Sequence, residues 1–142
     1  MNNFMAYENK MLYNTVDRTS VEIMVRTFYE VLIKDAIVGP FFIKALGDDF
    51  KNDKWYEHFR TLEKFWLMMM NGEPGYTGDP FGPHAFFRLT PETFDCWLQR
   101  FKEHVAQYFI PEIADKFYKK SEILAEQFMQ RLEIGKYAEE EE

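Results

Sequence analysis

Apolar side chains recur at helical spacing in four separate segments of this chain, and many of them are aromatic. Residues three and four positions apart lie on one face of an α-helix, so each segment predicts an amphipathic helix with one buried face. No segment shows the alternation of polar and apolar residues that is typical of a half-buried strand. The pattern therefore predicts an all-α fold. The apolar positions are Val21, Met24, Val25, Phe28 and Leu32; Trp55, Phe59, Leu62, Trp66 and Met69; Phe94, Trp97, Leu98, Phe101 and Val105; and Ile113, Phe117, Leu124, Phe128 and Leu132.

Residues that start or break helices separate these segments. Thr19 and Glu22 have the spacing of a capping box and predict the start of the first helix. Pro91 predicts the start of the third helix because proline favours the first turn, and Pro111 breaks the chain path before the fourth. The stretch 71–83 contains four glycines and three prolines. A loop of this length in a compact helical domain is usually functional or mobile.

The length and composition of the chain fit one domain, residues 1–142, with a substantial core. We expect residues 1–18 to form an N-terminal extension and the acidic tail, residues 137–142, to be disordered. Aromatic residues make up 18% of the chain. That content is enough to fill an ordinary core, and it is also enough to line a pocket for a large, flat ligand.

The charge of the chain argues against two classes of partner. The formal net charge is −7, whereas nucleic acids and anionic membranes are bound by clusters of Lys and Arg. No apolar block is long enough to span a bilayer, and the N-terminus lacks the basic and apolar regions of a signal peptide. The single cysteine, Cys96, is expected to be a small buried hydrophobic residue. We therefore expect a cytoplasmic protein without nucleic-acid or membrane partners.

Four polar or aromatic residues could form a site for an iron-porphyrin cofactor. His84 follows the long loop, and a neutral imidazole is a good iron ligand; the alternative is an exposed loop histidine. Tyr29, His58 and Trp97 lie in or beside helical stripes, and each can donate a hydrogen bond. Tyr29 and Trp97 can also be ordinary core residues. His58 can be a satisfied histidine, a distal donor or a sixth ligand to iron.

Other kinds of site are poorly supported by the sequence. It contains no HExxH, CxxC, Walker or GxGxxG motif. It also has no Glu-x-x-His pair of the type that builds a di-iron carboxylate bundle. His104 stands among charged and polar neighbours, and we expect it to lie at the surface.

Taken in order, the motifs of residues 20–109 resemble the truncated hemoglobins, and among them group III. Each motif is weak alone, but the ordered set is specific. The matching motifs are Phe28-Tyr29 followed by Asp35 and Gly39-Pro40-x-Phe42; Trp55-x-x-His58-x-x-x-Leu62-x-x-Phe65-Trp66; Tyr76-x-Gly78-x-Pro80-x-x-x-His84; and Leu89-x-Pro91-x-x-Phe94-x-x-Trp97-Leu98-x-x-Phe101.

The resemblance implies a globin-like, two-over-two helical sandwich around heme b. In such a protein His84 would be the proximal iron ligand. The distal pocket would contain Tyr29, His58 and Trp97. The other matched positions are Phe42, which would pack on the porphyrin; Phe28, Leu62 and Trp66, which would form pocket walls; and Tyr76, which would lie near the heme edge.

The resemblance also implies a function, with alternatives. The first hypothesis is a heme protein that binds O2, NO and CO at ferrous iron, with NO-dioxygenase activity if an external reductase serves it. The second is a peroxidase-like heme redox enzyme in which His58 acts as acid and base. The third is a cofactor-free helical interaction module whose aromatic residues only form a core.

Overall fold

The structure is a computed structural model that describes residues 4–7, 10–80, 84 and 87–137. Within this part of the chain almost all regular structure is helical, which confirms the predicted fold class. A short 3-10 helix, Gly135–Tyr137, follows the last α-helix. The α-helices are α1 (Arg18–Leu32), α2 (Gly39–Leu46), α3 (Asp53–Asn71), α5 (Pro91–Tyr108) and α6 (Pro111–Arg131).

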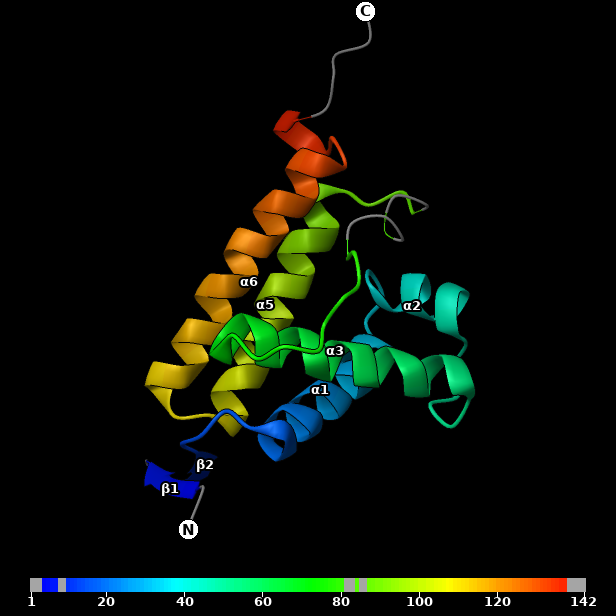
Figure 1. Cartoon of the computed structure of the whole chain (residues 1–142). Helices are drawn as coiled ribbons and strands as arrows, with labels where there is room; N and C mark the ends of the chain where they lie inside the picture. The colour runs from blue at the N-terminus through cyan, green and yellow to red at the C-terminus, as the bar shows by residue number, and fades with distance from the viewer. Residues whose placement is uncertain (1–3, 8–9, 81–83, 85–86, 138–142) are drawn as a thin grey trace, which may run out of the picture.

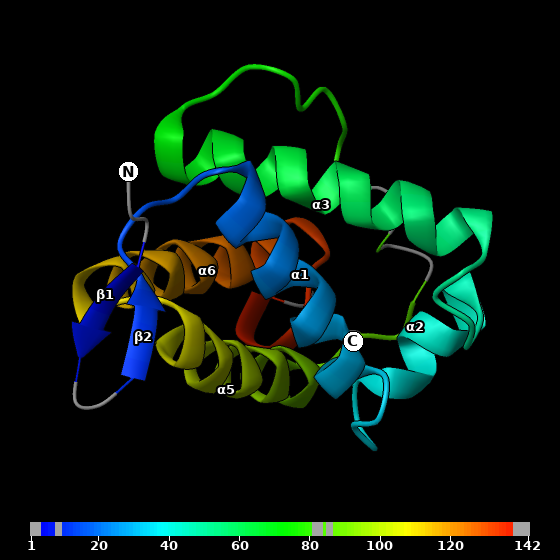
Figure 2. The ribbon, with the colours of Figure 1, turned by 90° about the horizontal axis from the view of Figure 1, so that it is seen from below.

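The four long helices form two pairs that cross each other. The helices α5 and α6 run side by side, while α1 packs along α3 (Figure 1). Seen from below, α1 lies between α3 and α5 (Figure 2). The α1–α3 pair therefore packs on the α5–α6 pair through the contact of α1 with α5. The short helix α2 lies outside this crossing, next to the N-terminal end of α3. This arrangement is the two-over-two sandwich that the resemblance implied.

The core is formed by aromatic rings at the crossing of the two pairs. Phe101 of α5 is fully buried, and Trp66 of α3 stacks on it with ring centroids 5.1 Å apart. Phe28 of α1 and Phe117 of α6 meet the same ring at 5.2 and 6.2 Å. Each helix therefore contributes a ring to one cluster, and burial of this apolar surface is the main force that holds the crossing together.

The start of α1 differs from the prediction. Asp17, not Thr19, is the N-cap: its carboxylate accepts from the backbone N–H of Ser20 at 2.9 Å, and the Ser20 hydroxyl accepts from the Asp17 N–H at 3.0 Å. The Ser20 hydroxyl is buried and also donates to the carbonyl of Thr15 at 2.9 Å. The capping box is therefore formed by Asp17 and Ser20, not by Thr19 and Glu22 as predicted. Burial of Ser20 in the folded chain favours this pair.

The N-terminal segment contains two strands that the sequence pattern did not indicate. Strands β1 (Phe4–Tyr7) and β2 (Lys10–Tyr13) form an antiparallel hairpin in which Phe4 pairs with Tyr13. Four residues are too few to show a clear alternation. The hairpin is attached to the junction between α5 and α6, because the N–H of Ile110, the N-cap of α6, donates to the Tyr13 carbonyl at 3.0 Å. Long-range contact with the helical domain therefore stabilises these strands.

After α3 the chain turns back, and the described part of the segment that follows runs along the outer side of this helix (Figures 1 and 2). It begins at Gly72, whose left-handed φ of 69° ends α3. Residues 72–80 are irregular, as the glycines and prolines predicted. Residues 81–83 of the predicted loop, and residues 138–142 of the acidic tail, lie outside the described part of the chain. Among the described residues no helix is long and apolar enough to cross a membrane.

Candidate functional site

His58 lies in the first half of α3, and its ring is enclosed by other rings. Tyr29 of α1 meets it edge-on with centroids 5.3 Å apart, Trp55 does so at 5.7 Å, and Phe42 of α2 lies 6.4 Å away. Its Nε2 is buried and has no hydrogen-bond partner in the described part of the chain. Burial, and secondarily the nearby His84, lower the pKa of His58 to about 4. The imidazole is therefore neutral at pH 7.

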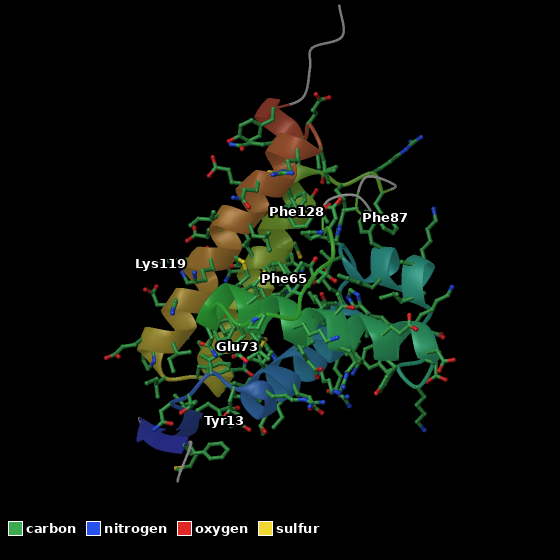
Figure 3. All side chains as sticks on the ribbon, viewed as in Figure 1. Tyr13, Phe65, Glu73, Phe87, Lys119 and Phe128 are labelled. Carbon is green, nitrogen blue, oxygen red and sulfur yellow. The ribbon has the colours of Figure 1, made fainter. Side chains whose placement is uncertain are left out.

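His84 lies in the segment between α3 and α5, and one nitrogen of its ring is already engaged. Its Nδ1 is 2.5 Å from the carbonyl oxygen of Pro80. Because a carbonyl oxygen only accepts, Nδ1 carries the proton and Nε2 keeps its lone pair. The ring packs edge-on against Phe128 of α6, at a centroid distance of 4.8 Å. In Figure 3, Phe128 points from α6 toward the segment that carries His84.

The surroundings of His84 favour the neutral imidazole. Burial lowers its pKa, and the hydrogen bond to Pro80 only partly opposes that effect. Residues 81–83 and 85–86, on either side of this histidine, lie outside the described residues. Among the described residues, Pro80 on one side and Phe128 on the other set the orientation of the ring.

Tyr29 is the second polar group in direct contact with His58. It is 6% exposed and packs edge-on against Phe42 and Phe28 at 5.0 and 5.7 Å. Burial raises the pKa of its hydroxyl, so the group remains a phenol and can donate a hydrogen bond. No partner for this hydroxyl is found among the described residues. Tyr29, His58 and Phe42, which the sequence placed in one pocket, are thus brought together by α1, α3 and α2.

Trp97 reaches this group indirectly. It lies on α5, is half-buried, and stacks on Phe101 with centroids 4.8 Å apart. Phe28 stands between Trp97 and Tyr29, touching them edge-on at 5.5 and 5.7 Å. Phe28 is 1% exposed, so it acts as the wall that joins the two predicted donors.

The other predicted pocket residues lie farther along α3 and in the segment that follows it. Leu62 is half-buried, one turn after His58. The contacts of Trp66 are with the core rings, stacked on Phe101 and edge-on to Phe117. Tyr76 meets Phe65 edge-on at 5.2 Å, and burial followed by the nearby charge of Asp79 raises the pKa of its hydroxyl.

The prediction that His104 lies at the surface is wrong. It is 5% exposed, its Nε2 donates to the Met24 carbonyl at 3.1 Å, and the same nitrogen lies 2.8 Å from the Thr27 hydroxyl. Burial lowers its pKa to about 4. The helical spacing could have indicated this burial, because His104 follows Phe101 by three positions and so lies on the same buried face of α5. Its polar neighbours in sequence belong to the outer face of α5.

Cys96 also differs from its expected environment. It is half-buried rather than buried. Its thiol lies 3.5 Å from one carboxylate oxygen of Asp35, Oδ1. The other oxygen, Oδ2, accepts a hydrogen bond from the Arg100 guanidinium at 3.1 Å. Asp35 thereby connects the end of α1 to α5, on which both Cys96 and Arg100 lie. This contact fixes the position of α5, and hence of Trp97, relative to α1.

The fold is a globin-like, two-over-two helical sandwich, and two neutral imidazoles, those of His58 and His84, lie near each other in it. The comparisons with known proteins agree. The chain is 29% identical to the Group 3 truncated hemoglobin ctb of Campylobacter jejuni over 123 residues, which are 86% of this chain and 95% of that protein.

The three-dimensional comparison gives the same result. The crystal structure of group III truncated hemoglobin from Campylobacter jejuni matches with a TM-score of 0.80 and 29% identity, over 92% of this chain and 100% of the other. No family model matches the chain. The predicted resemblance to group III truncated hemoglobins is therefore confirmed in sequence and in fold, over most of the chain.

Proposed function

We propose that this protein binds heme b and uses it to bind O2 and NO, with CO as a third ligand. The observation that carries the proposal is the pair of half-buried, neutral imidazoles, His58 and His84. Each has an Nε2 that no described protein group engages by a hydrogen bond. Such nitrogens fit the iron of a porphyrin, because neutral imidazole is a common axial ligand of heme iron. The similarity to truncated hemoglobins supports the same conclusion.

In this proposal His84 holds the iron. A ligating histidine usually donates its second N–H to a carbonyl or carboxylate, which fixes the tautomer and the direction of the ring. Pro80 supplies that acceptor here, and Phe128 limits rotation of the ring. Both contacts prepare Nε2 for a metal before any cofactor binds.

The remaining residues orient the ligand and exclude water. Bound heme supplies the reversible binding of a diatomic gas to ferrous iron. Tyr29, His58 and Trp97 would donate hydrogen bonds to that gas, and a neutral hydrogen bond contributes roughly 0.5–1.5 kcal/mol net. The pocket wall would be formed by Phe28, Phe42, Leu62, Trp66 and Tyr76, all of which are buried or half-buried. An external reductase would keep the iron ferrous, and we place the protein in the cytoplasm.

Hemin binding tests the proposal directly. We expect the purified chain to take up one equivalent of hemin and to show a Soret absorption band. His84→Ala should lose hemin to an excess of competing apoglobin at least tenfold faster than the wild type. His104→Gln is the matched control, because His104 is a buried histidine that points to α1 and not to the proposed site. A wild type that binds no hemin, or an unchanged spectrum and loss rate in His84→Ala, would contradict the proposal.

A further inference from the structure

The environment of His58 points to a more specific role, which rests on the proposed function. We infer that, when no gas is bound, the Nε2 of His58 occupies the sixth coordination position of the heme iron. The resting protein would then have two axial imidazoles, from His84 and His58, and an incoming gas would have to displace the second.

The first support is that packing fixes the ring of His58. Tyr29 and Trp55 both meet it edge-on, with interplanar angles of 86° and 79°, and Phe42 adds a third ring contact at 52°. These neighbours come from α1, α3 and α2, so three elements restrict the ring. A side chain enclosed in this way does not turn freely toward solvent.

The second support is the unsatisfied Nε2. In the described part of the chain, only two buried side-chain polar atoms lack a hydrogen-bond partner, and Nε2 of His58 is one of them. The ring of Tyr29 meets the imidazole edge-on at a centroid distance of 5.3 Å, but Tyr29 forms no hydrogen bond with this nitrogen. Native proteins rarely leave such a buried atom without a partner, so its partner is expected to be a bound group.

The third support is the position of His58 close to His84. The Nδ1 of His84 is engaged by the Pro80 carbonyl, and its Nε2 has no hydrogen-bond partner among the described residues. The Nε2 of His58 is likewise without a partner there. Two imidazole nitrogens are therefore available in the same part of the molecule, and heme iron takes axial ligands from protein side chains of this type.

The inference has a kinetic consequence. If His58 must leave the iron before a gas can bind, the observed binding rate levels off as the gas concentration rises. The plateau equals the rate at which His58 dissociates. Without an internal ligand the rate continues to rise in proportion to the gas concentration.

The experiment uses the full chain loaded with hemin. We expect six-coordinate, low-spin absorption and electron paramagnetic resonance spectra for the wild type, and a CO-binding rate that reaches a plateau in rapid mixing. His58→Leu should become high-spin, and its CO-binding rate should be at least tenfold faster than the wild-type plateau at high CO. His104→Gln should keep the wild-type spectra and plateau. Far-UV circular dichroism checks that each variant is folded.

Three outcomes separate this inference from the proposed function. A wild type that binds hemin but is high-spin, with water or no ligand opposite His84, overturns the inference alone. Low-spin spectra that persist in His58→Leu overturn it as well. Failure of the wild type to bind hemin instead overturns the proposed function. If His58→Leu does not fold, His58→Ala with added imidazole replaces it, and the inference requires that imidazole restore the low-spin spectrum.

Discussion

The three histidines show how the partners of a single residue decide its role. His104 gives its Nε2 to the Met24 carbonyl, and this side chain links α5 to α1. His84 gives its Nδ1 to Pro80 and keeps Nε2 available. His58 is surrounded by rings and keeps an unpartnered Nε2. The sequence singled out His58 and His84 as candidate ligands and placed His104 at the surface, whereas these hydrogen bonds distinguish one buried structural histidine from two potential ligands.

At the same scale, the hydroxyl of Tyr29 should slow the release of bound O2. We expect Tyr29→Phe to raise the O2 dissociation rate about threefold to tenfold, which corresponds to the loss of one hydrogen bond. Trp97→Phe should act in the same direction, since Trp97 lies behind Phe28 beside the same pocket. Stopped-flow dissociation measures both. Tyr56→Phe, at a tyrosine that is 56% exposed on α3, is the control. Unchanged rates in both variants would remove Tyr29 and Trp97 from the distal site.

At the scale of elements, the N-capping hydrogen bonds that start α1 and α3 also determine where the site residues lie. The cap of α1 sets the register in which Phe28 and Tyr29 face the interior. The Asn52 side chain caps α3 by accepting from the N–H of Trp55, whose indole N–H in turn donates to the Gly47 carbonyl at 2.8 Å. These bonds fix the start of α3 at Asp53, five residues before His58.

The start of α1 gives a prediction that separates the two capping schemes. Asp17→Ala should lower the free energy of unfolding by about 1 kcal/mol, the usual cost of losing an N-cap. Thr19→Ala should change it by less than about 0.5 kcal/mol, because Thr19 is exposed and caps nothing. Urea unfolding of the two variants measures both values. A larger loss of unfolding free energy in Thr19→Ala than in Asp17→Ala would show that Thr19, not Asp17, caps α1.

At the scale of the whole molecule, buried neutral histidines make stability depend on pH. The pKa of His104 is about 4 in the folded chain and near 6.5 when unfolded. Between pH 6.5 and 4 this histidine is protonated in the unfolded chain but still neutral in the folded chain. The free energy of unfolding therefore falls as the pH is lowered toward 4. Between pH 7 and 5 this effect amounts to about 2 kcal/mol for His104.

The variant His104→Gln isolates this contribution, because His58 and His84 remain and act in the same direction. We expect the loss of unfolding free energy from pH 7 to 5 to be smaller in the variant than in the wild type, by about 2 kcal/mol. Denaturant unfolding at several pH values measures it. Parallel curves for the two proteins would show that His104 titrates as freely in the folded chain as in the unfolded one.

The sequence by itself determined the four long helices and the order of the site residues, because helical periodicity and helix-breaking residues are local properties of a chain. It also singled out His58 and His84. Only the tertiary structure decided which surfaces meet. Packing of α5 on α1 buries His104, contact with Ile110 anchors the N-terminal hairpin, and the crossing of α1 and α3 covers Glu63, which is 4% exposed. These outcomes depend on residues distant in sequence, so no local pattern can specify them.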